Sequence, residues 1–201
     1  MNKPFRFSVW IHVWGYRWRR IVTKFWYSRI FRRVGVGCAF YPFGMLVGTE
    51  NISVGSGTTI RYGCRLETVE HGQSWRPHLS IGSGVNIEQN VHIICHDRVT
   101  IGDRVSITGH CAIVDVTHPF RIDKLVKMGR CIDGARSFVE IGEGSFLGFG
   151  TIVLPNVRIG RNCMIGAGSV VVSDIPDYSV AAGSPARVLK RHDIASPDVP
   201  D

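Results

Sequence analysis

An aliphatic residue recurs every six positions along most of this 201-residue chain. Fifteen residues, all isoleucine, leucine or valine, open such six-residue blocks: Val54, Ile60, Leu66, Ile81, Ile87, Ile93, Ile101, Ile107, Ile113, Ile141, Leu147, Val153, Ile159, Ile165 and Val171. The phase is unbroken from Ile141 to Val171. Helices repeat every 3.6 residues and ordinary strands every two, so neither produces this period. A chance run of aliphatic strands does not explain it either.

The fifteen openers form five groups of three, and three blocks make a unit of 18 residues. This spacing predicts a triangular coil with one short strand on each side. Most residues four positions after an opener are small or β-branched, as a narrow interior requires, and glycine follows seven openers, where it relieves a tight bend. Each coil can bury its aliphatic residues only against its neighbours. We therefore expect an all-β fold, a parallel β-solenoid of 18-residue triangular coils whose ends need caps.

Three segments interrupt the repeat: residues 72–80, the pair Val99-Thr100, and the long excursion 119–140. Insertions in a solenoid become side loops, which often carry binding surfaces. The loop 119–140 is therefore the main functional candidate. The predicted organisation is a helical segment at 1–35, the solenoid domain at 36–183 and a C-terminal extension at 184–201.

Positive charge is concentrated before the solenoid. The chain has 24 Lys and Arg against 16 Asp and Glu, and nine of the basic residues precede Glu50, the first acidic one. Tryptophans and other apolar residues recur at helical spacing among them, which predicts a basic amphipathic helix over 9–31. Such a helix either caps the open end of the first coil or makes a peripheral membrane contact, and the two roles are compatible. Nucleic acid is not expected as a partner, because no recognisable reading module is present.

The cysteines and the N-terminus bear on the compartment. The six cysteines form no CxxC pair, which is typical neither of a zinc ribbon nor of a secreted disulfide scaffold. No apolar stretch reaches the roughly 20 residues of a spanning helix, and arginines interrupt the apolar run that a signal peptide needs. We expect a cytoplasmic protein; a position at the inner face of the membrane stays open.

Several motifs join the repeat in a recognisable order. They are Thr117-His118-Pro119 before the long loop, the run 165–171, Asp174-Ile175-Pro176, and the run 182–187 that reads AGSPAR. Over roughly residues 50–191 the chain resembles the hexapeptide-repeat acyltransferases, and most of all their sugar O-acetyltransferase branch, similar to galactoside and maltose acetyltransferases and to enzymes that modify bacterial surface polysaccharides. This resemblance implies a left-handed β-helix, a homotrimer with active sites between subunits, and acetyl-CoA as cosubstrate.

Acetyl transfer to a hydroxyl needs a general base, and histidine titrates near neutral pH. His118 matches the catalytic histidine of the family in its Thr-His-Pro context; the alternative is that it only caps a turn. Asp115 would orient the imidazole if both side chains reach the same face, or it is a solvated turn carboxylate. The resemblance assigns no metal, because the related carbonic anhydrases carry two histidines five apart and position 123 is Asp123 here.

The acceptor and donor residues follow from the same resemblance. Acceptor binding is expected from Asn90, from Glu88, which departs from the usual asparagine, and from His96, which stands where the sugar enzymes carry an acid. Glu88 is alternatively a solvated side chain, and glycines near the donor are alternatively turn residues. The residues expected to bind acetyl-CoA are Gly148, Phe149, Gly166, Ala167, Ser173, Arg187 and Lys190. Ser173 replaces a lysine common in the sugar enzymes, which removes one contact to the donor.

The expected function is an acetyl-CoA-dependent O-acetyltransferase that acts on a saccharide acceptor, in bacterial surface-polysaccharide biosynthesis, with His118 as the base. Two alternatives remain: an N-acetyltransferase acting on an amino sugar or an antibiotic, and a non-catalytic solenoid scaffold. The sequence identifies neither the sugar nor the hydroxyl. It also leaves open which subunit's site the loop 119–140 covers.

Overall fold

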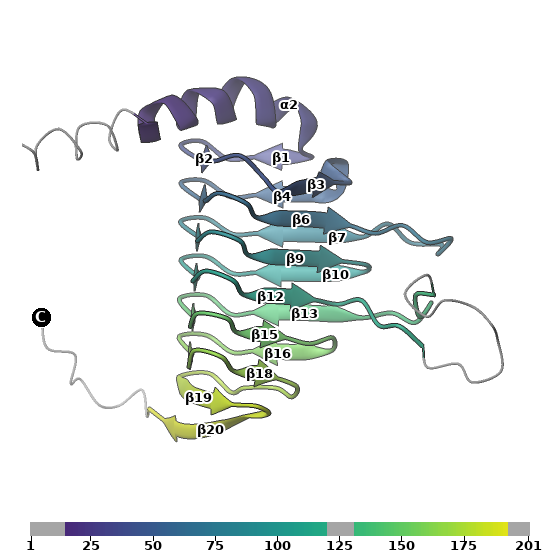
Figure 1. The fold of residues 1–201 in the computed structure, drawn as a ribbon, viewed down its shortest axis with the longest axis vertical. Helices are drawn as coiled ribbons and strands as arrows, with labels where there is room; N and C mark the ends of the chain where they lie inside the picture. Colours follow the sequence, from purple (N-terminus) through teal and green to yellow (C-terminus); the bar gives the residue numbers. More distant parts are fainter. Residues whose placement is uncertain (1–14, 120–130, 193–201) are drawn as a thin grey trace, which may run out of the picture.

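The structure, a computed structural model, describes residues 15–119 and 131–192. Three sheets, whose strands are all parallel except for the terminal β20, run along the sides of a triangular prism (Figure 1). The first sheet contains β1 (Arg33–Val34), β4 (Ile52–Val54), β7 (His78–Ile81), β10 (Arg98–Ile101), β13 (Phe138–Ile141) and β16 (Val157–Ile159). The second contains β2 (Ala39–Phe40), β5 (Thr59–Ile60), β8 (Asn86–Ile87), β11 (Ser106–Ile107), β14 (Phe146–Leu147), β17 (Met164–Ile165), β19 (Ser179–Gly183) and β20 (Ala186–Arg191). The third contains β3 (Met45–Val47), β6 (Arg65–Thr68), β9 (His92–Cys95), β12 (Ala112–Val114), β15 (Ile152–Val153) and β18 (Val170–Val171).

The core is the predicted ladder of openers. Each of the fifteen is at most 2% exposed, and they stack in register, as Ile87, Ile107 and Leu147 do in the second sheet. Burying such a side chain contributes about 1.5–3 kcal/mol, and no coil can achieve this without a neighbour. The predicted left-handed β-helix of triangular coils is confirmed.

Two of the three predicted interruptions leave the coil close to where they were expected, but the third is wrong: Val99 and Thr100 lie within β10 and pair in register with the neighbouring strands. Ile141 pairs with Ile159, eighteen residues on, whereas Ile101 pairs with Ile141 across the long excursion. The excursions around 69–77 and 115–137 both leave the third sheet and return to the first, so both begin and end at the same edge of the prism (Figure 1). We call this edge the loop edge. The turn edge is the corner between the second and third sheets, formed by turns such as 88–91, 108–111, 148–151 and 166–169.

The solenoid begins earlier and ends later than the openers indicate. The strands β1, β2 and β3 form an additional first coil in which Val34, Phe40 and Leu46 keep the six-residue phase. The six-residue pattern does not reveal this coil, because its second opener is the aromatic Phe40 and because the short 3-10 helix η2 (Thr49–Asn51) interrupts the spacing before β4. At the other end β20, within the segment predicted as an extension, pairs antiparallel with β19.

A helix lies across the open end of the first coil (Figure 1). Residues 15–22 are α-helical, and the π-helix η1 (Thr23–Tyr27) and the short α2 (Ser28–Ile30) continue them. The Thr23 hydroxyl accepts a hydrogen bond from the Phe40 N–H at 2.8 Å, and the Tyr27 ring packs against those of Phe31 and Phe40. One face of the helix therefore covers the end of the ladder.

The predicted helix is only partly visible. Trp10 and Trp14 lie outside the described residues. Trp18, Phe25 and Trp26 are exposed, so the tryptophans of the described part do not bury themselves in the cap. No described helix is both long enough and apolar enough to span a bilayer.

Candidate active site

His118 follows β12 at the loop edge, where the chain leaves the coil, and its side chain is exposed. Its Nδ1 lies 2.7 Å from the carbonyl oxygen of Cys131, on the returning arm of the long excursion. A carbonyl oxygen only accepts hydrogen bonds, so this contact requires the proton on Nδ1. In the neutral imidazole Nε2 then keeps its lone pair, which is the form that a general base needs.

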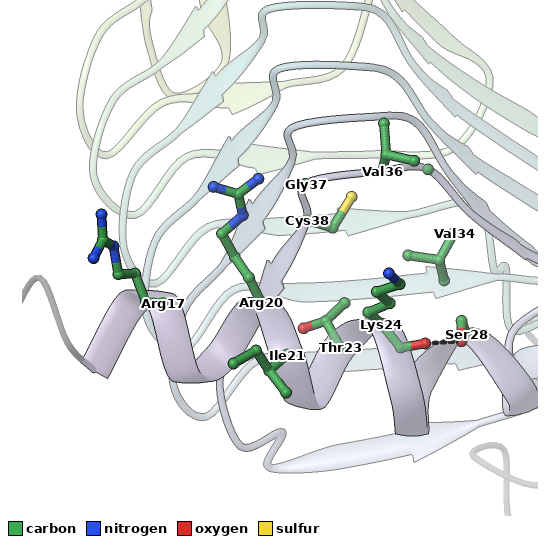
Figure 2. Close-up of a pocket in the computed structure, with 11 residues that line it drawn as sticks. Arg17, Arg20, Ile21, Thr23, Lys24, Ser28, Val34, Val36, Gly37 and Cys38 are labelled. Atoms are coloured by element: carbon green, nitrogen blue, oxygen red, sulfur yellow. Dashed lines mark hydrogen bonds between the residues drawn. The ribbon is translucent and has the colours of Figure 1, made fainter.

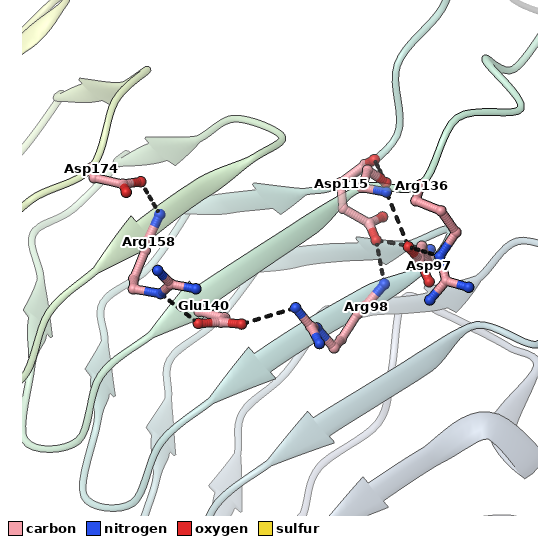
Figure 3. Close-up of polar contacts among 8 residues, drawn as sticks. Asp97, Arg98, Asp115, Arg136, Glu140, Arg158 and Asp174 are labelled. Atoms are coloured by element: carbon pink, nitrogen blue, oxygen red, sulfur yellow. Dashed lines mark hydrogen bonds and ion pairs between the residues drawn. The ribbon is translucent and has the colours of Figure 1, made fainter.

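Asp115 does not contact the imidazole, and the expected orienting pair is wrong. Its fully buried carboxylate accepts backbone N–H groups of His96, Asp97 and Arg98, the last two at 2.9 and 2.8 Å (Figure 3). Burial raises the pKa of Asp115 above its usual value. These hydrogen bonds and nearby His96 oppose that shift without cancelling it. Asp115 therefore holds the turn between β9 and β10, and the Cys131 carbonyl orients His118 in its place.

The same edge is tied together by a second buried carboxylate. Asp97 accepts the Arg136 guanidinium at 2.7 Å and the Ser137 N–H at 3.0 Å (Figure 3). Ser137 also donates its hydroxyl to the Asp115 carbonyl at 2.7 Å. These bonds fasten the returning arm of the excursion to the coil. A hollow of about 150 Å³ remains beside them, lined by Asp115, Thr117, Asp133, Ala135, Arg136, Ser137 and Asn156.

His96 lies at the loop edge and is only 2% exposed. Neither of its ring nitrogens has a hydrogen-bond partner within the described part of the chain. The Trp75 ring from the excursion 69–77 packs edge-on against it, with ring centroids 5.7 Å apart, and the Arg136 guanidinium lies over Trp75. His96 is thus a buried polar ring near the candidate base, and Trp75 covers it in the single chain.

Asn90 and Glu88 lie at the turn edge, away from His118. The Glu88 carboxylate accepts the Asn86 amide at 2.8 Å and lies 3.8 Å from the Arg61 guanidinium. Asn90 and His110 occupy the left-handed backbone position that glycine fills in other coils, and their Nδ2 and Nε2 atoms are 3.4 Å apart. A strand such as β9 separates the two edges by about 13 Å, so one chain does not bring Asn90 and His118 together.

Four of the expected donor residues line the turn edge. The Phe149 ring packs against that of His110 in a tilted arrangement, with ring centroids 5.0 Å apart. Neither the Phe149 nor the Ala167 N–H donates a hydrogen bond to another group among residues 15–119 and 131–192. A Cβ at Gly148 would lie 2.6 Å from the Ala167 nitrogen, and one at Gly166 would lie 2.8 Å from the Ala182 Cβ. These glycines therefore allow the coils to approach closely.

The remaining donor residues are spread over the C-terminal end. Arg187 and Lys190 are exposed on β20, and neither forms an ion pair with a described carboxylate. Ser173 follows β18 and so lies at the loop edge, apart from Gly166 and Ala167. In the described ranges no three His, Cys, Asp or Glu side chains gather in a way that could hold a metal ion. Asp123 lies outside those ranges.

Sequence reasoning missed several residues of the two edges. His110 has a detectable signal, because a histidine stands at a turn position that is glycine in other coils. Trp75, Arg136 and the Cys131 carbonyl have none, since they come from the excursions, where no repeat fixes their position.

The comparisons with known proteins agree with this fold. Residues 138–173 match the family model described as bacterial transferase hexapeptide (six repeats). The chain is 38% identical over 114 residues to a galactoside O-acetyltransferase of Lactococcus lactis, a match covering 57% of this chain and 53% of that protein. It is 29% identical to WbbJ of Escherichia coli, a putative lipopolysaccharide biosynthesis O-acetyl transferase, over 86% of this chain and 87% of WbbJ.

Among solved structures, the N-acyltransferase AntD of Bacillus cereus, crystallised with dTDP and 3-hydroxybutyryl-CoA, superposes with a TM-score of 0.71 at 20% identity, covering 83% of this chain and 86% of AntD. At that identity the likeness concerns the fold alone. The chain spans little more than half the length of the galactoside O-acetyltransferases it matches.

Fold and repeat together define a left-handed β-helix built from six-residue repeats, of which residues 138–173 match the bacterial transferase hexapeptide model. Within that class the chain resembles the sugar O-acetyltransferases, and the resemblance predicted from its residues is confirmed.

Proposed function

We propose that the chain transfers an acetyl group from acetyl-CoA to a hydroxyl of a saccharide, with His118 as the general base. The observation that carries this proposal is the 2.7 Å contact between His118 Nδ1 and the Cys131 carbonyl, because it leaves Nε2 as a proton acceptor on an exposed edge. The similarity to galactoside O-acetyltransferases and to WbbJ supports a saccharide acceptor and a role in polysaccharide synthesis.

The chemistry needs four groups. His118 Nε2 accepts the hydroxyl proton while the hydroxyl oxygen attacks the thioester carbonyl, and a new C–O bond forms. The oxyanion of the tetrahedral intermediate accepts a hydrogen bond from a backbone N–H, for which Phe149 is the candidate. The C–S bond then breaks, and the thiolate of CoA takes the proton from the imidazolium. Arg187 and Lys190 supply positive charge for the phosphates of CoA.

This assignment requires a second chain. His118 stands at the loop edge and Phe149 at the turn edge, so a site containing both forms only where the loop edge of one copy meets the turn edge of another. We propose a homotrimer with three such sites. Outward-facing apolar side chains on the second and third sheets, such as Phe146, Ile152 and Met164, support lateral association. The cytoplasmic location remains a prediction.

The test is release of CoA from acetyl-CoA with a panel of saccharides, measured by chromatography because the cysteine thiols would react with a thiol reagent. His118→Ala is expected to lower kcat about 10²- to 10⁴-fold, the usual contribution of a general base. His71→Ala, an exposed histidine in the other excursion, is the matched control. Undiminished turnover by His118→Ala would show that His118 is not the general base. Turnover with amino sugars alone would favour N-acetylation, and none with any acceptor would favour a scaffold.

A further inference from the structure

A groove separates the capping helix from the first coil (Figure 2). Its volume is about 540 Å³. The helix side is lined by Arg17, Arg20, Ile21, Thr23, Lys24 and Ser28, and the coil side by the run Val34–Cys38. It lies at the opposite end of the prism from β20 and uses none of the residues assigned to acetyl transfer (Figure 1).

The groove is positively charged without compensation. Arg17, Arg20 and Lys24 reach it from the helix, and no carboxylate of the described chain lies within ion-pair distance of any of them. The sequence itself has no acidic residue before Glu50. The guanidinium of Arg20 lies against Gly37, so at least this cation is directed at the coil side. Three cations around a partly apolar space are suited to a phosphate that belongs to an amphiphile.

The outward face of the same helix is apolar. Trp18 is 60% exposed, Phe25 56% and Trp26 66%, and Ile21 lies between them. Trp18 and Phe25, seven residues apart, lie on one helix face, opposite Thr23 and Tyr27, which anchor the helix to the coil. Ile21 lies at the border between this face and the groove, which it also lines. The aromatic face is thus outermost, and the cations lie between it and the coil. This order matches a helix in a lipid interface, where aromatic rings enter the acyl boundary and basic side chains stay at phosphate level.

We propose that this end of the molecule docks on an anionic bilayer surface, with lipid phosphate groups held in the groove by Arg17, Arg20 and Lys24. A second copy of the chain is a poorer occupant, because two such cationic faces repel each other. The proposal stands apart from the acetyl-transfer assignment, and it is tested without any turnover.

The experiment is sedimentation of the full chain with phosphatidylcholine vesicles, with or without about one third phosphatidylglycerol, at two salt concentrations. We expect binding only to the anionic vesicles. Arg17→Gln/Lys24→Gln should weaken it about 30-fold, since each basic residue near the surface contributes about 1 kcal/mol. Arg158→Gln/Arg161→Gln removes the same charge from the far end of the prism and should retain nearly all binding. Trp18→Ser/Phe25→Ser should lose the binding that survives high salt.

Circular dichroism and thermal melting show whether each variant is folded. Absence of binding to anionic vesicles by the folded wild type would overturn the proposal, and so would equal losses in the two arginine-containing double variants. Concentration-dependent association through this face without vesicle binding would identify a second copy as the occupant. Binding of glycerol 3-phosphate as tightly as vesicles would identify a soluble phosphate, and tighter binding of RNA than of vesicles a nucleic acid.

Discussion

The loop edge and the turn edge border the same third sheet but are built in different ways. At the loop edge, the buried carboxylate of Asp115 accepts backbone N–H groups of the β9–β10 turn, and that of Asp97 accepts a guanidinium and an N–H from the long excursion. At the turn edge, glycines let one coil lie directly on the next. The first edge depends on hydrogen bonds to inserted segments and the second on close stacking. In the proposed site, the repeat would therefore supply a uniform surface for the donor, and the insertions would supply the groups that differ from coil to coil.

The strongest test of whether the two edges act together is to inactivate each edge in a different chain. His118→Ala removes the proposed base from the loop edge. Asn90→Gly, which suits the left-handed backbone at that position, removes the amide expected to bind the acceptor at the turn edge. If each site takes one edge from each of two copies, equal mixtures unfolded and refolded together should regain about one quarter of the wild-type sites, by random assortment in a cyclic oligomer.

The readout is CoA release by each variant alone, by the mixture before refolding and by the mixture after it. Activity that stays at the level of the separate variants after confirmed subunit exchange would mean that both edges act within one chain, contrary to the proposed arrangement.

The second test concerns stability of the loop edge. Asp115→Ala leaves the buried backbone N–H groups of His96 and Asp97 and the partly buried N–H of Arg98 without their acceptor. An unsatisfied buried group costs about 1–3 kcal/mol. We expect a loss of about 3 kcal/mol in the free energy of unfolding, measured by urea titration with tryptophan fluorescence. Asp174→Ala is the control, because its carboxylate accepts a single exposed N–H, that of Arg158. Equal losses in the two variants would contradict the role assigned to Asp115.

The third test addresses the turn edge. Gly148→Ala places a Cβ against the backbone of Ala167, and crowding of this kind costs about 1–3 kcal/mol. Gly150→Ala has nothing within 4 Å and suffers only from its positive φ of 70°, for which we expect about 1 kcal/mol. The urea midpoints of the two variants separate stacking from backbone strain; a smaller loss in Gly148→Ala would show that the coils can spread.

The six-residue period of the sequence predicted those parts of the fold that repeat from coil to coil. It located the ladder from Val54 to Val171 and the two long excursions, because these follow from counting along the coil, whereas His118 was singled out by its Thr-His-Pro context and Val99-Thr100 was wrongly taken as an interruption. It did not reveal the coil at β1–β3, where Phe40 replaces an aliphatic opener. The sequence also did not predict that Asp115 binds backbone N–H groups of the β9–β10 turn. Its closeness to His118 in the sequence does not indicate that its carboxylate points into the coil. Trp75 and Arg136 belong to excursions whose return path no period determines.

The regular stacking of the coils also sets a height. Neighbouring strands lie about 4.8 Å apart, and three strand steps along the third sheet lead from β3, next to the capping helix, to β12, which His118 follows. The base is therefore held about 14 Å along the prism from the first coil. With the capping helix on a bilayer as proposed, the solenoid would act as a spacer: the reactive hydroxyl would stand that far beyond a helix that is itself about 10 Å thick. Insertion or removal of one coil would shift the reacting hydroxyl by one strand spacing without altering the site.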